Sequence, residues 1–303
     1  IETTGKWPDF NAWVVIVLLP KNDGGLRPIG LIATYIRVWM RCRRHHIATW
    51  RAANQKTYLF GGKGKGAQRA AWMQAARAET AKLTKQAYGV ALLDLVKAFE
   101  KIPHQHIYAA AKKHGYCLWT LRLSLACYRM NRVISIDGAV SRPVQAVLGI
   151  TAGSGFACEE LCCLLTDICD DLISSTRGFP TVVLSQYVDD LTIEQTGSAP
   201  FVMRILSGAV DQVVAALEEM LELEVSATKS IVIGSKPGLA SAIASHGQTK
   251  KVKPANSGKM LGVGTCAAAH RCTAILKTRI KNVQARLHRV LALRIQGVNT
   301  EGW

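Results

Sequence analysis

The stretch Ser185–Glu194, SQYVDDLTIE, guides the interpretation of the whole chain, because it sets two carboxylates side by side between apolar residues. Upstream, TVVLSQYV is β-branched and aromatic, which is typical of a strand. Downstream, LTIE alternates, so Leu191 and Ile193 are expected on one face of a second strand, and Thr192 and Glu194 on the other. Asp189 and Asp190 then lie at the tip of a predicted β-hairpin.

Two hypotheses explain the acidic pair. Asp favours turns through local hydrogen bonds, so the pair can be a solvated turn. Alternatively, the two carboxylates bind a hard divalent cation, which takes oxygen ligands and offsets their repulsion. Such a site needs a further carboxylate, and Asp94 is the candidate because it follows the apolar run GVALL, where an unpaired charge is unfavourable. The alternative role for Asp94 is an N-cap of the next helix.

Length and composition indicate a folded protein with a polyanionic partner. The 303 residues are 49% hydrophobic, enough to bury a sizeable core. The 38 Lys and Arg residues outweigh 21 Asp and Glu, and the net charge of +17 points to nucleic acid or an anionic membrane. No apolar run approaches the roughly 20 residues that a membrane helix requires. The sequence therefore predicts a soluble protein without a membrane partner.

The positive charge is concentrated in the last quarter of the chain. Thirteen Lys and Arg residues, and no Asp or Glu, lie between Val225 and Thr300. A solvated surface normally mixes both signs, so this stretch is predicted to lie against a phosphate backbone. The alternative is a basic tail with unspecific affinity. Apolar residues from Leu276 to Val290 recur at three- and four-residue steps, which predicts a helix with basic residues around an apolar seam.

The cysteines indicate the redox state of the compartment in which the protein is expected. Most of the nine lie within apolar helical patterns, which indicates small buried side chains in an intracellular protein kept reduced, in the nucleus or the cytoplasm. The chain begins at Ile1 without an initiator Met or a signal-peptide pattern, as expected for a portion of a longer protein.

The predicted elements mix antiparallel hairpins with helices. An Ala-rich helix is predicted from Gly66 to Ala87, and Asp137 with Gly138 marks a second hairpin turn. The segment YIRVWMRCRRHH predicts a helix with a basic face. This order favours the α+β class over a doubly wound parallel sheet.

Six segments, in order along nearly the whole chain, resemble the motifs of the reverse transcriptases. LLDLVKAFEKIPH and YVDDL are similar to motifs A and C. LPKNDGGLRPIGL resembles the fingers motif, GITAGSGFA motif B, ATKSIVIGSK motif D and GKMLGV motif E. Within the family, the form DLVKAFEKIPH is closest to the enzymes of non-LTR retrotransposons and group II introns.

The resemblance implies a right-hand polymerase fold with fingers, a palm of antiparallel sheet plus helices, and the start of a helical thumb. It implies fingers over residues 1–89 and a palm over residues 90–265, with fingers elements at about 104–148. Residues 266–303 would be the thumb or its connection.

The resemblance also implies a metal site for nucleotidyl transfer. Asp94 and Asp189 would bind the metal ions, Mg²⁺ with Mn²⁺ as the alternative, and Asp190 and the Leu95 carbonyl would assist. Three acids from two strand ends can hold two cations roughly 3.5 to 4 Å apart. Lys229 matches a lysine proposed to protonate the pyrophosphate, and its alternative is an ordinary surface charge.

Further residues match the family's nucleotide site. Phe99 matches the steric gate, a bulky ring that crowds a 2′-hydroxyl and favours deoxynucleotides, although a core Phe has the same sequence signature. Lys21 and Arg27 match cations that grip the triphosphate, with ordinary surface charges as the alternative. Gly149 and Gly153 would let the backbone approach the incoming base pair.

Motif B departs from the family at one position. Most members read G-x-x-Q-G, and Ala152 stands in the Gln position here. The amide that contacts nucleotide or template is therefore absent, while the acids of the predicted metal site are retained.

Together these resemblances imply an RNA-directed DNA polymerase that uses deoxynucleoside triphosphates. Six basic residues are expected to hold the RNA template and its DNA or RNA primer: Arg41, Arg43, Arg44, Lys277, Lys281 and Arg286. One alternative is an RNA-directed RNA polymerase or terminal transferase. Another is a non-catalytic RNA-binding module of the kind found in maturases, against which the three retained acids argue.

Overall fold

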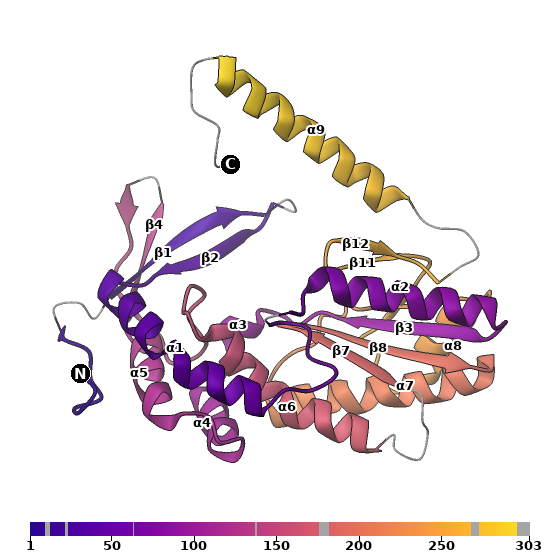
Figure 1. Cartoon of the computed structure of the whole chain (residues 1–303), viewed down its shortest axis with the longest axis horizontal. Coiled ribbons are helices and arrows are strands. Elements are labelled where there is room, and N and C mark those ends of the chain that lie inside the picture. The colour runs from indigo at the N-terminus through magenta and orange to yellow at the C-terminus, as the bar shows by residue number, and fades with distance from the viewer. Residues whose placement is uncertain are drawn as a thin grey trace.

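Two five-stranded sheets and a small hairpin organise the helices of the computed structural model (Figure 1). The mixture of helices with largely antiparallel strands confirms the predicted α+β class. How the chain divides into fingers, palm and thumb stays a prediction. The structure describes residues 1–9, 13–21, 24–62, 64–136, 138–175, 182–267 and 273–295.

The first sheet, here called the N-terminal sheet, joins two distant parts of the chain. Its order is β2-β1-β4-β5, and β6 also pairs with β4. β1 and β2 form an antiparallel hairpin, whereas β1 and β4 are parallel. Gly138 lies at the predicted turn between β4 and β5, and Asp137 lies outside the described residues. The strands are β1 Trp13–Pro20, β2 Leu26–Leu31, β4 Asn131–Ile136, β5 Ala139–Val140 and β6 Val144–Gln145.

The second sheet, here called the central sheet, carries the acidic pair. Its order is β10-β9-β3-β8-β7, and β7 and β8 are antiparallel neighbours, which confirms the predicted hairpin. β3 pairs antiparallel with β8 on one side and β9 on the other. The strands are β3 Ala87–Leu93, β7 Val183–Tyr187, β8 Asp190–Gly197, β9 Ile231–Gly234 and β10 Lys253–Ala255.

Helices cover both faces of the central sheet (Figure 1). Helix α2, Ala67–Leu83, lies on one face, and α7, Ala199–Ala215, packs against β3 and β8 on the other. Thr192 and Glu194 of β8 are therefore buried, at 3% and 1% exposure. They lie on the face opposite Leu191 and Ile193, as the alternation predicts, and α2 covers that face.

The remaining helices surround these layers. Most of the buried apolar residues form one continuous core that joins both sheets to their helices. The hairpin β11–β12 lies beside α2, and α9 projects from the body of the molecule beyond it (Figure 1). These elements are α1 Thr34–Ala53, α3 Ala98–Lys101, α4 His104–Lys113, α5 Leu118–Tyr128, α6 Ala157–Ser175, α8 Leu239–His246, β11 Gly258–Met260, β12 Val263–Thr265 and α9 Ala274–Ile295.

Within the described residues, one helix is long and apolar enough, by length and composition, to cross a membrane. It comprises α7 and its π-helical continuation, together Ala199–Met220. In the sequence, Arg204 and Asp211 interrupt its apolar run, so no uninterrupted run reaches membrane-spanning length. In the fold, its residues Val202 and Leu206 are buried beside Gly89 of β3, as in a core helix of a globular domain.

The cysteines within the described residues are free thiols. Some are buried as expected of small apolar side chains: Cys127, Cys162, Cys163 and Cys169. Cys42 and Cys158 are instead exposed, so burial describes only part of the set.

Candidate active site

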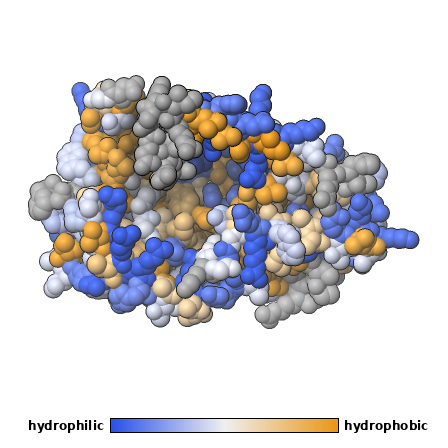
Figure 2. Space-filling view, turned by 45° about the horizontal axis from the view of Figure 1, so that its top comes forward, coloured by the Kyte–Doolittle hydropathy of each residue, from blue (hydrophilic) through white to orange (hydrophobic). Residues whose placement is uncertain are grey.

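The fold brings the three predicted acids to one edge of the central sheet. Leu93, the last residue of β3, pairs with Leu191 of β8, so Asp94 leaves its strand beside the β7–β8 turn. Asp189 lies in that turn, and Asp190 pairs with Tyr187 at its base. Asp94 and Asp189 are half-buried, and Asp190 is exposed. Figure 2 shows a hollow near the middle of this face of the molecule, with both hydrophilic and hydrophobic side chains around it.

The turn that carries Asp189 has an unusual backbone. Val188 has φ of 58°, a left-handed conformation that β-branched residues rarely adopt. Such a residue persists only where its surroundings hold it, at about 1–3 kcal/mol of strain. The buried Gln186 supplies one restraint, because its side-chain amide donates to the Val188 carbonyl at 3.2 Å.

Burial and neighbouring negative charges raise the pKa values of Asp189 and Asp190. Burial raises the pKa of Asp189, and the charge of Asp94 raises it further, while its own backbone N–H and Arg27 oppose the rise. Loss of surrounding water and the charges of Asp189 and Asp94 raise the pKa of Asp190 to about 6. The three carboxylates therefore act on one another electrostatically, as a shared cation site requires.

Carboxylates and a backbone carbonyl are the ligands that divalent cations such as Mg²⁺ take. The donor set therefore fits such a cation, whose charge would relieve the repulsion at Asp189 and Asp190. No three His, Cys, Asp or Glu side chains of the described ranges form a ready-made metal cluster.

The backbone of Asp94 is clamped by the segment that carries Lys229. Ser230 Oγ accepts from the Asp94 N–H at 3.0 Å, and the Asp94 carbonyl accepts from the Ser226 N–H at 2.8 Å. Leu95 is buried in a bridge with Val225. Lys229 itself is exposed in the turn between the two serines, so motifs A and D are joined through the backbone.

Backbone hydrogen bonds join motif B to helix α3, which carries Phe99. The Ile150 N–H donates to the Phe99 carbonyl at 2.6 Å, and the Gly149 N–H donates to the Ile102 carbonyl at 2.7 Å. Gly149 has φ of 87°, and a Cβ there would lie 2.7 Å from the Phe99 carbonyl oxygen. Only glycine fits this approach. Phe99 is half-buried against the core, consistent with either predicted role.

Motif B also touches the N-terminal sheet. The Gly30 N–H of β2 donates to the Ala152 carbonyl at 2.7 Å. A Cβ on Gly153, whose φ is 118°, would lie 2.4 Å from the Gly30 carbonyl oxygen. Lys21 and Arg27 are both exposed on this side, Lys21 beyond the end of β1 and Arg27 within β2. Of the two, Arg27 acts on the charge of Asp189.

His104 is a site residue that sequence analysis missed. It is 4% exposed and its Nε2 lies 2.9 Å from the Gly149 carbonyl, while Arg129 Nε donates to its Nδ1 at 3.2 Å. Burial, with the charges of Arg129 and Arg132, lowers the pKa of His104. The imidazole is therefore neutral, with the proton on Nε2. In the sequence, only the position of His104 at the end of FEKIPH, within the motif A segment, could have pointed to it.

The predicted nucleic-acid contacts fall into three environments. Arg41 and Arg44 are exposed on one face of α1. Arg43 instead forms a bidentate ion pair with Glu2 and lies over Trp119, which separates it from the other two. Arg43 stays a predicted nucleic-acid contact, and its guanidinium is paired with Glu2. On α9, the predicted contacts Lys277, Lys281 and Arg286 are all exposed.

Comparison with known families identifies the chain. The model of the family described as reverse transcriptase (RNA-dependent DNA polymerase) matches residues 19–264. The chain belongs to the reverse transcriptase family, as the order of its motifs predicts. This membership supports a polymerase of the reverse-transcriptase type, a class that acts on nucleic acid and generally uses divalent metal ions.

Solved telomerase structures show a similar fold. A telomerase of Candida tropicalis, in complex with the TWJ fragment of telomeric RNA, aligns with a TM-score of 0.62 and 9% identity, over 87% of this chain and 45% of that one. The apo enzyme of that species, truncated from its C-terminal domain, gives 0.58 and 10%, over 86% and 54%. The telomerase of Candida albicans with the same RNA fragment gives 0.56 and 11%, over 86% and 47%. This chain thus spans about half the length of these structures. The comparison with curated proteins gives no match.

Proposed function

We propose that this chain is an RNA-directed DNA polymerase that adds deoxynucleotides to a primer paired with an RNA template. One observation carries the proposal: Asp94, Asp189 and Asp190 meet at one edge of the central sheet, from segments almost 100 residues apart. Like charges collected at a half-buried edge are unfavourable unless a cation compensates them. Family membership supplies the class of reaction.

The acids would hold Mg²⁺, with Mn²⁺ as the alternative. Asp94 and Asp189 would be ligands, and Asp190 and the Leu95 carbonyl would assist. When bound, the divalent cations would supply positive charge that activates the attacking oxygen and stabilises the leaving one. The clamp of Ser226 and Ser230 on the backbone holds Asp94 in place for that role.

Other side chains would bind the nucleotide around this centre. Lys21 and Arg27 would grip the triphosphate, and the influence of Arg27 on Asp189 supports its part. Phe99 would exclude the 2′-hydroxyl, and Gly153 would admit the base pair. Lys229 would protonate the pyrophosphate from the turn beside Asp94.

The nucleic-acid partners would be an RNA template and a DNA or RNA primer. Lys277, Lys281 and Arg286 would follow the duplex along α9, on the exposed helix that leaves the body of the molecule. The free thiols support a reducing intracellular compartment. The motif form DLVKAFEKIPH supports the branch of non-LTR retrotransposon and group II intron enzymes.

Primer extension tests the proposal. The purified chain would be given an RNA template, an annealed DNA primer, deoxynucleotides or ribonucleotides, and Mg²⁺ or Mn²⁺. We expect template-dependent extension with deoxynucleotides. Extension with ribonucleotides alone would favour an RNA polymerase, extension without a template a terminal transferase, and tight RNA binding without extension a maturase-like module.

Phe99→Val should relax the choice of sugar. The smaller side chain removes ring atoms that would crowd the 2′-hydroxyl, so the preference for deoxynucleotides should fall by about tenfold or more. The ratio of kcat/KM for a deoxynucleotide to that for its ribonucleotide measures this. Phe201→Val is a matched control, because Phe201 is half-buried beside Gly197, at the end of β8 opposite Asp190. An unchanged ratio in Phe99→Val would remove Phe99 from the gate.

A further inference from the structure

Glu160 is a buried carboxyl group that has no part in the proposed mechanism. It lies in the first turns of α6, directly after the motif B loop, and is 1% exposed. In the described part of the chain, no cationic side chain acts on its charge. An unpaired carboxylate in the interior is strongly unfavourable, so a position that keeps an acid there is a candidate for a specific role.

The surroundings of Glu160 keep it neutral at pH 7. Burial raises the pKa of Glu160 to about 8, and hydrogen bonds from Tyr128 and Ser124 of α5 only partly oppose the rise. The charge of Glu159 adds to the rise. Other titratable groups around this cluster, none of them a cation at pH 7, are Tyr116, Cys127, Cys163 and His104.

A chain of hydrogen bonds links Glu160 to the motif B loop. The Tyr128 hydroxyl lies 2.5 Å from Glu160 Oε2 and 2.8 Å from Ser154 Oγ. Ser154 Oγ also accepts from the Phe156 N–H at 3.2 Å, directly before α6 begins. Tyr128 is 0% exposed, so water does not compete for these bonds. The loop is therefore attached to Glu160 through a single buried hydroxyl.

The cation of this region is directed to other partners. Arg132 of β4 donates to the Tyr128 carbonyl at 3.3 Å and to the Thr151 hydroxyl at 3.4 Å. Thr151 is 2% exposed and belongs to the same loop. The guanidinium thus holds the first part of the motif B loop and leaves the carboxyl of Glu160 without a counter-ion.

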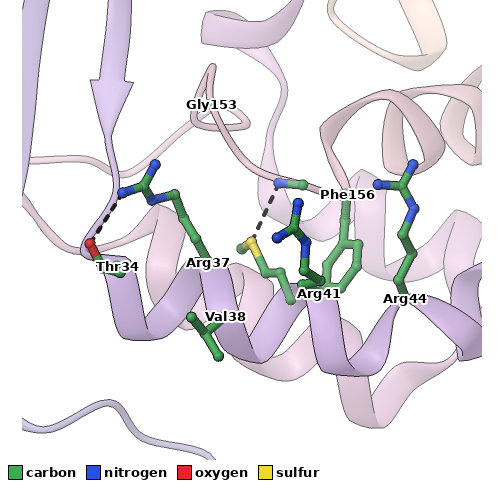
Figure 3. Close-up of a pocket in the computed structure, with 9 residues that line it drawn as sticks. Thr34, Arg37, Val38, Arg41, Arg44, Gly153 and Phe156 are labelled. Atoms are coloured by element: carbon green, nitrogen blue, oxygen red, sulfur yellow. Dashed lines mark hydrogen bonds between the residues drawn. The ribbon is translucent and has the colours of Figure 1, made fainter.

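The tip of the loop borders open space. Gly153 and Gly155 are exposed and line a cavity of about 430 Å³ beside α1 (Figure 3). From α1, Met40 Sδ accepts from the Gly155 N–H at 3.4 Å, and a thioether is a weak acceptor. Ser154, between the two glycines, anchors the tip from the buried side. The position of the tip should therefore depend on the bond that Ser154 makes with Tyr128.

The protonation state of Glu160 decides the direction of this chain. Tyr128 has one hydroxyl hydrogen and two acceptors within reach. When Glu160 is neutral, its carboxyl O–H can donate to the Tyr128 oxygen, so Tyr128 donates to Ser154. When Glu160 is ionised, the carboxylate is the stronger acceptor and takes the Tyr128 hydrogen. Ser154 then loses its donor, and a charge without a counter-ion remains in the interior.

We infer that Glu160 is a positioning residue for the motif B loop, which it holds through Tyr128 and Ser154. The neutral acid fixes the loop, and ionisation of the acid loosens it. The inference rests on the proposed function for its consequence only. Gly153 would admit the incoming base pair, so a loosened loop should weaken nucleotide binding.

The first test follows the loop itself, without substrate. Hydrogen exchange of the peptide over residues 149–157 is measured by mass spectrometry from pH 7 to pH 9 in the parent and in E160Q, which retains a donor for Tyr128 and cannot ionise. E159Q is the matched control, because it makes the same change at a half-buried neighbour that pairs with Arg51. Comparison at equal pH removes the intrinsic effect of pH on exchange, and thermal unfolding verifies that each variant folds.

We expect the parent and E160Q to exchange alike at pH 7, and the parent to exchange about three- to tenfold faster at pH 9, as loss of one hydrogen bond implies. The midpoint of this change should lie near pH 8. E159Q should follow the parent. Y128F, which removes the connecting hydroxyl, should exchange at pH 7 as fast as the parent does at pH 9. Equal exchange in the parent and E160Q at every pH would overturn the inference, and so would a step near pH 8 that E159Q abolishes as well.

The second test uses primer extension over the same pH range. The ratio of KM for a deoxynucleotide in the parent to that in E160Q should rise about three- to tenfold between pH 7 and pH 9, while the ratio of the two kcat values stays within about twofold. A residue that acted on the metal-binding acids would instead change kcat. A KM ratio that does not depend on pH would remove Glu160 from nucleotide binding.

The two tests separate this inference from the proposed function. If the parent extends no primer, but its loop loosens near pH 8 and that of E160Q does not, the positioning role stands and the polymerase assignment falls. If the parent extends primers, and its loop exchanges like that of E160Q at every pH, the polymerase stands and the positioning role falls.

Discussion

Asp189→Asn should reduce primer extension by about 100- to 1000-fold while the protein still folds. The substitution keeps the shape of the side chain but removes one negative charge from a site whose acids would hold divalent cations. Loss of a single group that stabilises transition-state charge typically has an effect of this size. The measurement is the rate of single-nucleotide addition at saturating substrate and Mg²⁺.

A matched control is Asp171→Asn, which makes the same chemical change at an exposed position of α6. It should extend the primer at the parent rate. If Asp189→Asn were as fast as Asp171→Asn, Asp189 would have no catalytic part and the polymerase proposal would be lost.

The acids that are proposed to support catalysis should lower the stability of the folded protein when no metal ion is bound. The pKa of Asp190 rises from 3.8 to about 6 in the folded protein, so ionisation of Asp190 disfavours the folded state above pH 6. In metal-free buffer, Asp190→Asn should therefore unfold at a higher temperature than the parent at pH 7.5. The gain should shrink as the pH falls from 6 toward 4, where the folded parent is protonated. Thermal unfolding at several pH values checks this, and a pH-independent difference would contradict it.

Mg²⁺ provides a readout that does not depend on activity. The cation should raise the unfolding temperature of the parent, because it would bind only the assembled acids. Asp189→Asn should lose most of that increase, and Asp171→Asn should keep it. An equal increase in all three proteins would mean that Mg²⁺ binds elsewhere.

Arg77→Met should lower the free energy of unfolding by about 3 kcal/mol. Glu194 is 1% exposed between α2 and the central sheet, and Arg77 forms a two-armed ion pair with it, one arm at 2.9 Å. Tyr88 also donates to Glu194, at 2.7 Å, and accepts from Gln74. Removal of one partner leaves a buried charge without its counter-ion, which typically costs about 3–5 kcal/mol. The lower figure applies because Arg77 is partly exposed.

Urea unfolding measures the effect of Arg77→Met. The control is Lys113→Met, which breaks an ion pair with Asp167 in which Lys113 is 65% exposed and which should contribute about 1 kcal/mol or less. The double variant Arg77→Met/Glu194→Leu should recover part of the loss, because it also removes the buried charge. If Arg77→Met cost no more than Lys113→Met, the buried pair would have no special role in the fold.

The hairpin of Asp189 and the strand before Asp94 could be predicted because both are local patterns. Alternating or continuous apolar residues and turn-forming Asp occur within ten positions of the chain. The convergence of Asp94 on Asp189 needed the family resemblance, since strand pairing over almost 100 residues leaves no periodic signal. The parallel pairing of β1 with β4 was missed for the same reason.

Glu194 and His104 show why other buried polar contacts could not be predicted from the sequence. Glu194 alternates with apolar residues like a solvent-facing side chain, and only the distant helix α2 buries it. His104 is one polar residue in a short helix, and its role depends on Arg129 and on the Gly149 carbonyl. Charge alone likewise could not separate Arg43 from Arg41, because the neutralising Glu2 is some 40 residues away.

The contact between Gly30 and Gly153 makes the two halves of the site mechanically dependent. The β1–β2 hairpin is joined to motif B at Gly30, and motif B is joined to the Phe99 carbonyl at Ile150. If the hairpin binds a triphosphate, as proposed, a displacement of the hairpin would move the motif B loop and, through Ile150, the helix that carries Phe99. The proposed sugar discrimination at Phe99 would then depend on the nucleotide that the hairpin holds.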